Sequence, residues 1–196
     1  LYETRVACQW DDERLYVAYW IEEPQVRATL TERDSFIWND NDVELFVAGD
    51  DCYYELEINS FGTVYDAFFV WQDALRRGSR FDRPELDLYS RDVDLLGGFQ
   101  DASRWGRHPR GRRFAFLDFD LAGLETAVQV DGRINDPTTI DRGWTVEMAV
   151  PFKSLRFKAP GEQIWGINFL RVVRWKNELS HLTRVPAAWV PGVQLP

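Results

Sequence analysis

Apolar and polar residues alternate with a period of two along much of the chain. In the run 53–59, for example, Leu56 and Ile58 fall on one side and Glu55 and Glu57 fall on the other. Successive side chains of a β-strand point to opposite faces of a sheet, so this alternation is typical of strands with one apolar and one polar face. The pattern predicts strands at residues 15–22, 42–48, 53–59, 63–71, 125–131, 144–150 and 164–174.

Turn residues separate these runs. Gly49-Asp50-Asp51, Ser60-Phe61-Gly62 and Asp131-Gly132 are combinations that favour tight turns between strands. The segment 151–155 begins with proline and is expected to form a single helical turn. Regular strands without a long helical period predict an all-β fold, a two-sheet antiparallel β-sandwich of the immunoglobulin or jelly-roll kind. We expect residues 1–196 to form one domain, because no linker-like segment divides them.

One stretch departs from this pattern. Residues from about 74 to 113 are rich in arginine and glycine and show no period. We interpret them as a long irregular insertion, because loops of this length are uncommon inside compact domains. Two interpretations stay open: a surface loop whose arginines pair with nearby carboxylates, or a loop that lines a ligand site.

Charge and composition exclude some functions. The net charge of −9 at pH 7 argues against a nucleic-acid or anionic-membrane binder, since both need a basic face. No apolar run approaches the roughly 20 residues of a membrane span. Nine tryptophans and seven tyrosines are many for 196 residues, and aromatic rings both fill cores and form platforms for sugar rings. The two cysteines, Cys8 and Cys52, lie in strand-like runs as buried free thiols or as a disulfide pair.

Enzyme chemistry has weak support. Glycoside hydrolysis needs two carboxylates about 5–10 Å apart. Glu44, Glu55, Glu57 and Glu147 lie on polar strand faces and could converge, or they could be ordinary solvent-facing or arginine-paired residues. The histidines, His108 and His181, are too far apart in sequence for a zinc motif. Met148 belongs to the apolar side of its strand and is expected in the core rather than as a haem ligand. We therefore predict no catalytic residues.

Calcium binding is a further possibility, because oxygen-rich turns suit this ion. Three segments offer such oxygens: Asn39-Asp40-Asn41-Asp42, Asp50-Asp51, and the turn 131–136 with Asp141. We select the third turn as the predicted structural Ca²⁺ site, with ligands Asp131, Asn135, Asp136 and Asp141. The alternative is that these side chains bond to their local backbone, as Asp and Asn do in turns.

Two tryptophans lie in loops beside polar residues. Trp38 follows Ser35-Phe36-Ile37 just before a predicted strand, and Trp189 lies in the proline-flanked loop 185–191. Sugar rings stack on such aromatic faces while their hydroxyls bond to Asp, Glu, Asn and Arg. Each tryptophan is either such a platform or a packing residue that holds its loop on the domain.

The order of motifs resembles the family-9 carbohydrate-binding modules over nearly the whole chain except the insertion. The segments that resemble the family are Leu15–Trp20, Trp38–Val47, Tyr53–Asn59, Gly62–Asp66, Ala127–Gly132 with Asn135-Asp136, Asp141–Phe152 and Trp165–Arg171. Each motif is degenerate, but their order and spacing together are specific. The resemblance implies a sandwich related to the haem- and sugar-binding domains of extracellular proteins, and a secreted or periplasmic location.

The resemblance also implies a function: non-catalytic binding of a sugar or glycan end, in polysaccharide catabolism. In the family, two tryptophans clamp a terminal sugar, and Trp38 matches the first while Trp189 is placed as the second. Glu44 matches the acidic partner, and Asn168 and Arg171 are placed among the ligand-binding residues. Glu55 and Glu57 stand where the family has an arginine. An attached or partner glycoside hydrolase is expected, and the alternative is a hydrolytic domain that uses paired carboxylates.

Overall fold

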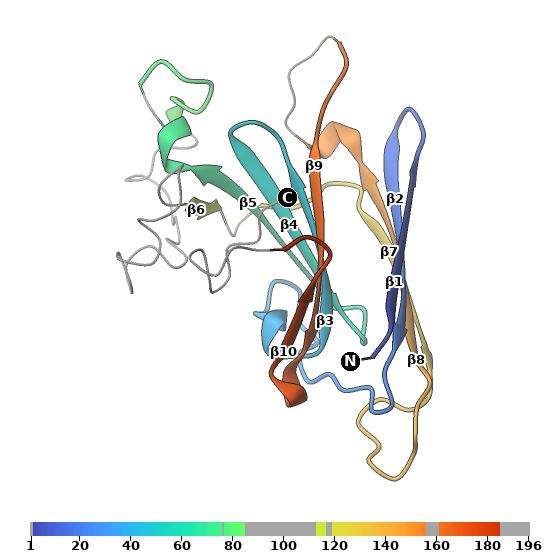
Figure 1. The fold of residues 1–196 in the computed structure, drawn as a ribbon. Coiled ribbons are helices and arrows are strands. Elements are labelled where there is room, and N and C mark those ends of the chain that lie inside the picture. The colour runs from blue at the N-terminus through green and yellow to red at the C-terminus, as the bar shows by residue number, and fades with distance from the viewer. Residues whose placement is uncertain (1, 76, 85–112, 117–118, 156–160, 185–196) are drawn as a thin grey trace.

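The computed structural model describes residues 2–75, 77–84, 113–116, 119–155 and 161–184. Two antiparallel sheets lie face to face, which confirms the predicted β-sandwich (Figure 1). The four-stranded sheet has the order β1 (Thr4–Trp10), β2 (Arg14–Glu22), β8 (Gly143–Pro151) and β7 (Glu125–Asp131). The six-stranded sheet has the order β10 (Glu178–His181), β9 (Gly166–Val173), β3 (Asp42–Ala48), β4 (Cys52–Asn59), β5 (Val64–Trp71) and β6 (Arg113–Phe116).

The helices of the described chain are short 3₁₀ turns: η1 (Ile37–Asn39), η2 (Gln72–Ala74), η4 (Phe152–Ser154) and η5 (Arg174–Lys176). None of them is long and apolar enough to cross a membrane. The turn η4 confirms the predicted helical turn after Pro151. All seven predicted strands are present, with ends that shift by no more than a few residues.

The inner faces of the two sheets form the core. The apolar side of each predicted alternation points inward: Leu45 of β3, Leu56 of β4 and Met148 of β8 are all buried. Met148 is therefore core filler, as predicted. Tyr19 of β2 crosses between the sheets and donates a hydrogen bond from its hydroxyl to the carbonyl of Glu44, at 2.8 Å. Hydrogen bonding of this buried hydroxyl satisfies a polar group that would otherwise be costly in the core.

The cysteines are free thiols and lie in different sheets, so they form no disulfide. Cys52 is buried as predicted, whereas Cys8 is exposed. The prediction of a buried Cys8 is wrong because β1 is an edge strand, which leaves much of its surface open.

The arginine-rich insertion connects neighbouring strands, β5 and β6. Of the predicted range 74–113, the segment 85–112 and Arg76 lie outside the described residues. Within the described part, Arg80 pairs with Asp51 at 3.5 Å and its guanidinium lies 4.7 Å from the ring centre of Phe81. Arg80 thus pairs with a nearby carboxylate, as one of the two interpretations of the insertion predicts.

Candidate functional site

The outer face of the six-stranded sheet combines carboxylates with aromatic rings. Val43 and Leu45 point into the core, so Asp42 and Glu44 point away from it. The strand register places Glu44 opposite Glu57 of β4 and opposite Leu170 of β9. We call this surface the acidic–aromatic face; its members on β3, β4 and β5 are Asp42, Glu44, Phe46, Tyr53, Glu55, Glu57, Tyr65, Phe69 and Trp71.

These carboxylates are buried. Asp42 is 0% exposed, Glu57 1% and Glu44 2%. The interpretation of Glu44, Glu55 and Glu57 as solvent-facing strand residues is therefore wrong, because the second face of this sheet is covered as well as the first. Glu147, the fourth glutamate of that group, lies exposed on the four-stranded sheet and does not converge with them.

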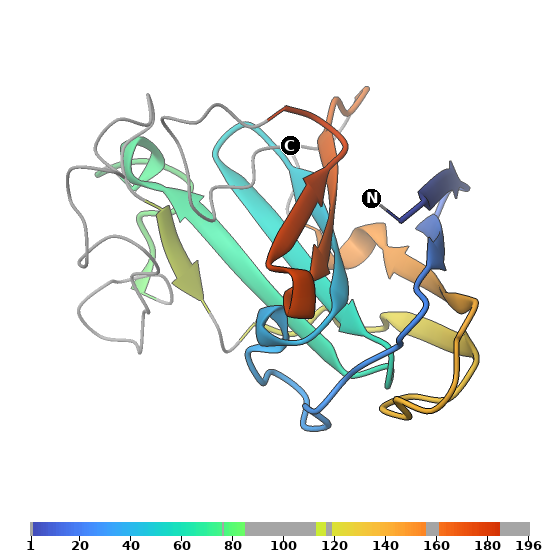
Figure 2. The same cartoon turned by 60° about the horizontal axis from the view of Figure 1, so that its bottom comes forward.

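Trp38 lies on the acidic–aromatic face. It belongs to η1, which lies beside the start of β3 on the side of the sheet that faces away from the four-stranded sheet (Figures 1 and 2). Its indole packs against Tyr65 in a T-shaped arrangement, with ring centres 5.2 Å apart and planes at 85°. Phe36, which is 48% exposed, stacks on Trp38 at 4.5 Å. Tyr65 is opposite Glu57 and therefore shares the face of the sheet that holds Glu44. The loop thus folds back and brings Trp38 to this face.

Asn168 and Arg171, both on β9, lie on opposite faces. Asn168 is opposite Phe46 and shares the acidic–aromatic face. It is fully buried, and its side-chain oxygen accepts hydrogen bonds from the backbone of Phe169 at 2.9 Å and Thr183 at 3.2 Å. Asn168 therefore ties down the segment after β10 as well as facing the site.

Arg171 points between the sheets. Its guanidinium donates to Thr4 Oγ1 at 2.8 Å and to the carbonyl of Glu22 at 2.7 Å, and lies 3.6 Å from the carboxylate of Glu23. These contacts join β9 of one sheet to β1 and β2 of the other. In this arrangement Arg171 connects the two sheets and does not reach the face that holds Glu44. Trp189 lies outside the described residues.

Burial and mutual repulsion raise the pKa values of the site carboxylates. The pKa of Glu57 lies well above its usual range because of desolvation first and then the charges of Glu44, Asp42 and Glu55. The pKa of Asp42 is also raised, chiefly by desolvation and by the charges of Asp40 and Glu55. Arg174 offsets part of the effect on Asp42. The site therefore favours protons or a bound cation over bare negative charge.

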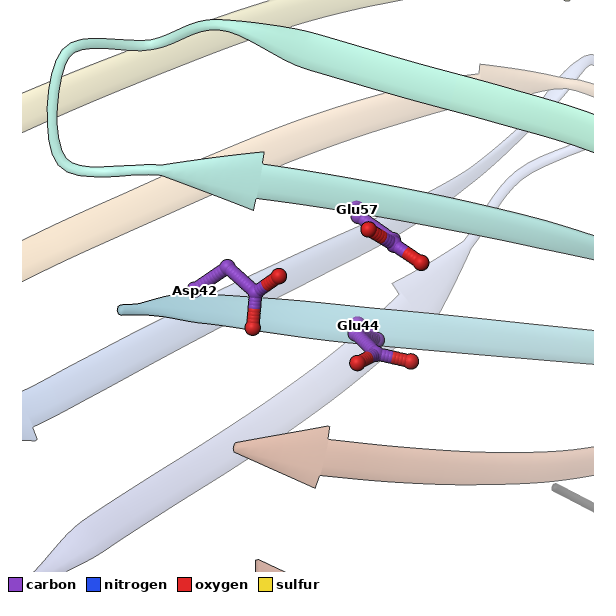
Figure 3. A group of neighbouring side chains, drawn as sticks. All are labelled: Asp42, Glu44 and Glu57. Atoms are coloured by element: carbon purple, nitrogen blue, oxygen red, sulfur yellow. The ribbon is translucent and has the colours of Figure 1, made fainter. Parts of the chain in front are cut away.

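Three of these carboxylates converge. Asp42 and Glu44 from β3 and Glu57 from β4 lie on one side of the sheet, with strands of the other sheet behind them (Figure 3). One oxygen from each lies within 4.8 Å of the others. Such a group can share protons, or it can hold a metal ion through oxygen ligands.

The turn predicted to bind calcium uses its side chains within the fold. Asp141 is buried and accepts hydrogen bonds from the backbone N–H of Val26 at 2.9 Å and of Arg133 at 2.8 Å. Asn135 adopts a left-handed conformation with φ 63°. Its side chain accepts from the N–H of Ala28 and donates to the same residue's carbonyl.

The other two predicted ligands of this turn are similarly engaged. Asp131 pairs with Arg142 at 3.5 Å, and Asp136 accepts from the N–H and hydroxyl of Thr138 at 2.9 and 2.6 Å. These contacts match the alternative of local turn bonding. Calcium binding by this turn stays a prediction.

Sequence reasoning missed the roles of Asp42 and Tyr65 on the acidic–aromatic face. Asp42 alternates with Val43 and so shares the outward side with Glu44. The tight turn Gly49-Asp50-Asp51 sets the register that brings Glu44 opposite Glu57. The turn and the alternation together could have grouped the three carboxylates, whereas the contact between Tyr65 and Trp38 depends on the path of a loop.

The architecture defines a two-layer antiparallel β-sandwich with an acidic and aromatic face on one sheet. Residues 2–81 match the model of carbohydrate-binding family 9. Over 92% of its length the chain also superposes on 67% of a crystal structure from Bacteroides uniformis ATCC 8492, a candidate carbohydrate-binding protein, with a TM-score of 0.55 and 17% identity. At that identity the likeness shows the fold alone. No curated protein sequence matches the chain.

Proposed function

We propose that the chain is a non-catalytic module that binds a sugar or the end of a glycan on the acidic–aromatic face. The observation that carries this proposal is the contact of Trp38 with the carboxylate-bearing strands. Its ring packs against Tyr65 in a T-shaped arrangement, and the strand register places Tyr65 opposite Glu57 and Glu57 opposite Glu44. An aromatic ring beside carboxylates supplies both a stacking surface and acceptors for hydroxyl groups. The family match over residues 2–81, which includes Trp38 and Glu44, supports the same function.

The substitution Trp38→Ala tests the proposal. Loss of a stacking ring should weaken sugar binding by about 2 kcal/mol or more, roughly 30-fold in Kd, while the melting temperature changes little. Binding is measured by calorimetry with a sugar selected on a glycan array. Trp10→Ala is the matched control, because Trp10 is 75% exposed at the end of β1 in the other sheet. If Trp38→Ala lowers the melting temperature and leaves the affinity of the folded protein unchanged, Trp38 only packs its loop.

Hydrolysis by paired carboxylates is the competing function, and the convergence of Glu44 and Glu57 is the observation that favours it. A hydrolase would use one protonated and one ionised carboxyl group on either side of the scissile bond. The family whose model matches residues 2–81 is one of carbohydrate-binding modules, which supports binding rather than hydrolysis. We therefore expect no release of reducing sugar from any glycan that the module binds. Turnover that Glu57→Gln abolishes would overturn the non-catalytic assignment.

The wider setting belongs to the same proposal. A binding module of this kind would act in a secreted or periplasmic protein and hold polysaccharide near an attached or partner glycoside hydrolase. The expected ligands are mono-, oligo- or polysaccharides and not nucleic acids, in line with the net charge of −9.

A further inference from the structure

Several buried carboxylates of the described chain have hydrogen-bond donors around them. Asp40 is an example: its two oxygens accept from the N–H of Thr29 at 2.8 Å, the hydroxyl of Thr29 at 2.7 Å and the N–H of Leu30 at 2.9 Å. Glu23 likewise accepts from the indole N–H of Trp144 at 2.8 Å. The fold thus satisfies the carboxylates that it uses structurally, as native proteins normally do.

Asp42 is different, although it lies only two residues after Asp40. It is 0% exposed, and neither of its oxygens has a hydrogen-bond partner within the described part of the chain. One oxygen of Glu57 is also buried without a partner there. An unpartnered buried carboxylate costs far more than an unpartnered neutral group. These atoms therefore need something that the described residues do not supply.

The nearby protein cation does not meet that need. Arg174 acts on Asp42 electrostatically, but its guanidinium donates to Asn39 Oδ1 at 3.0 Å and its backbone N–H donates to Asn41 Oδ1 at 2.7 Å. It forms no ion pair with Asp42 among the contacts of the described residues. One oxygen of Asp42 instead lies in the group that includes an oxygen each of Glu44 and Glu57 (Figure 3).

We propose that Asp42, Glu44 and Glu57 form a binding site for a divalent cation, and that Ca²⁺ is the ion the site selects. The three donor oxygens lie within 4.8 Å of one another. Ca²⁺ binds oxygen at about 2.3–2.6 Å, so two ligands on opposite sides of the ion are about 4.6–5.2 Å apart. The group is thus compact enough to enclose a calcium ion with small side-chain adjustments.

The kind and number of donors select the ion. All three ligands are carboxylates, which bind hard cations such as Ca²⁺ and Mg²⁺. Zinc and copper instead prefer sites with imidazole or thiolate ligands. Asp42 has two available oxygens and can bind in a bidentate manner, which suits the six to eight ligands of Ca²⁺ better than the strict octahedron of Mg²⁺. The site goes beyond sugar binding and does not depend on it, because an ion here neutralises the buried face whether or not a sugar binds.

The experiment uses the full chain after treatment with a chelator. Because the ion binds the folded state, Ca²⁺ at a hundredfold excess over its Kd should raise the melting temperature by roughly 5–10 °C, and Mg²⁺ should raise it less. Asp42→Asn, which keeps the shape and removes the charge, should abolish the response. Glu147→Gln on the other sheet and Asp136→Asn in the predicted calcium turn should keep it.

Each outcome has a meaning. Equal responses of Asp42→Asn and the parent protein would overturn the site, and a response lost only in Asp136→Asn would assign the ion to the turn instead. Absence of calcium from the untreated protein by elemental analysis, together with no thermal response, would also overturn it. If Asp42→Asn does not fold, Glu57→Gln serves in its place with the same expectations. Measuring glycan binding with and without Ca²⁺ separates the two proposals: calcium binding without sugar binding leaves the cation site intact and removes the proposed function.

Discussion

The outer faces of the two sheets follow the same alternating pattern but have different surroundings. On the four-stranded sheet, Trp20 of β2 and Glu147 of β8 are exposed and line a shallow hollow of about 600 Å³. On the six-stranded sheet, Glu57 and Glu44 occupy equivalent outward positions and are almost completely buried. The same residue type thus lies in water on one sheet and in a desolvated cluster on the other.

This difference identifies the face on which function is expected. An exposed glutamate such as Glu147 keeps its hydration and costs the fold almost nothing. Glu57 and Asp42 have raised pKa values because they have lost that hydration beside other carboxylates. Groups with pKa values perturbed by burial and by specific neighbours gather at functional sites more often than elsewhere. The acidic–aromatic face is therefore the stronger candidate site of the two.

The largest expected effect comes from a residue that belongs to neither outer face. Arg171→Ala removes the guanidinium that joins β9 to β1 and β2 and leaves Glu23 buried without its cation. Breaking such a pair should lower the free energy of unfolding by about 3–5 kcal/mol, measured by urea denaturation. Arg14→Ala is the control, because its pair with Glu125 is partly exposed and should contribute less than about 1 kcal/mol. A loss of sugar affinity with unchanged stability would instead return Arg171 to the ligand site.

The second-largest expected effect on stability concerns Asp66, a buried carboxylate of β5 that does have hydrogen-bond donors. Asp66 accepts a hydrogen bond from the N–H of Leu121 and pairs with Arg33, yet desolvation outweighs both and raises its pKa from 3.8 to about 6. The folded state holds this proton more tightly than the unfolded state. Asp66 therefore contributes stability below about pH 4 that is lost as the pH rises through about 6, a change of about 3 kcal/mol.

Unfolding of the parent protein and of Asp66→Asn across pH 4–7 measures this contribution. The asparagine does not titrate, so the stability difference between the two proteins should shift toward the variant as the pH rises. A difference that stays constant over this range would show that the pKa of Asp66 is not raised.

The alternation of residues was enough to predict most of the fold. Long runs such as 42–48 and 53–59 repeat the pattern often enough to define a strand and its two sides. The predicted set lacks three strands: β1, whose sequence is short and mixed, and β6 and β10, which have only four residues each and are too short to show a period. Short strands such as β6 and β10 form by pairing with a neighbouring strand. The partner of β6 is β5, which is distant from it in sequence.

The site was predictable in part for the same reason. Alternation correctly directs Glu44 away from the core, and it would also have placed Arg171 on the inward side with Phe169. Whether an outward side is covered depends on segments far away in the chain, so a period of two does not distinguish Glu57 from Glu147. The position of Trp38 over Tyr65 likewise follows from a tertiary contact that local sequence does not encode.

The same substitution on each outer face tests the comparison directly. At pH 8 with chelator present, Glu57→Gln removes a charge from a buried cluster and should stabilise the protein by about 1–3 kcal/mol. Glu147→Gln removes a hydrated charge and should change stability by less than about 0.5 kcal/mol. Because the pKa of Glu57 is raised, the advantage of its glutamine variant should grow as the pH increases. Equal effects of the two substitutions in urea denaturation would mean that the two faces do not differ electrostatically.

The smallest expected effect is that of Trp20→Ala. Trp20 is 42% exposed and lines the hollow on the four-stranded sheet together with Tyr16 and Ala18. Removing its ring leaves no enclosed cavity, because the side chain already borders solvent, so the free energy of unfolding should fall by about 1 kcal/mol or less.

The affinity for a bound glycan should not change if the sugar lies on the acidic–aromatic face. Trp20 also lines a second hollow of about 490 Å³ beside the first, together with Glu3, Glu22 and Asp131, so the four-stranded sheet is an alternative surface with an aromatic ring and nearby carboxylates. A glycan affinity that falls in Trp20→Ala and persists in Trp38→Ala would therefore move the binding site to the four-stranded sheet.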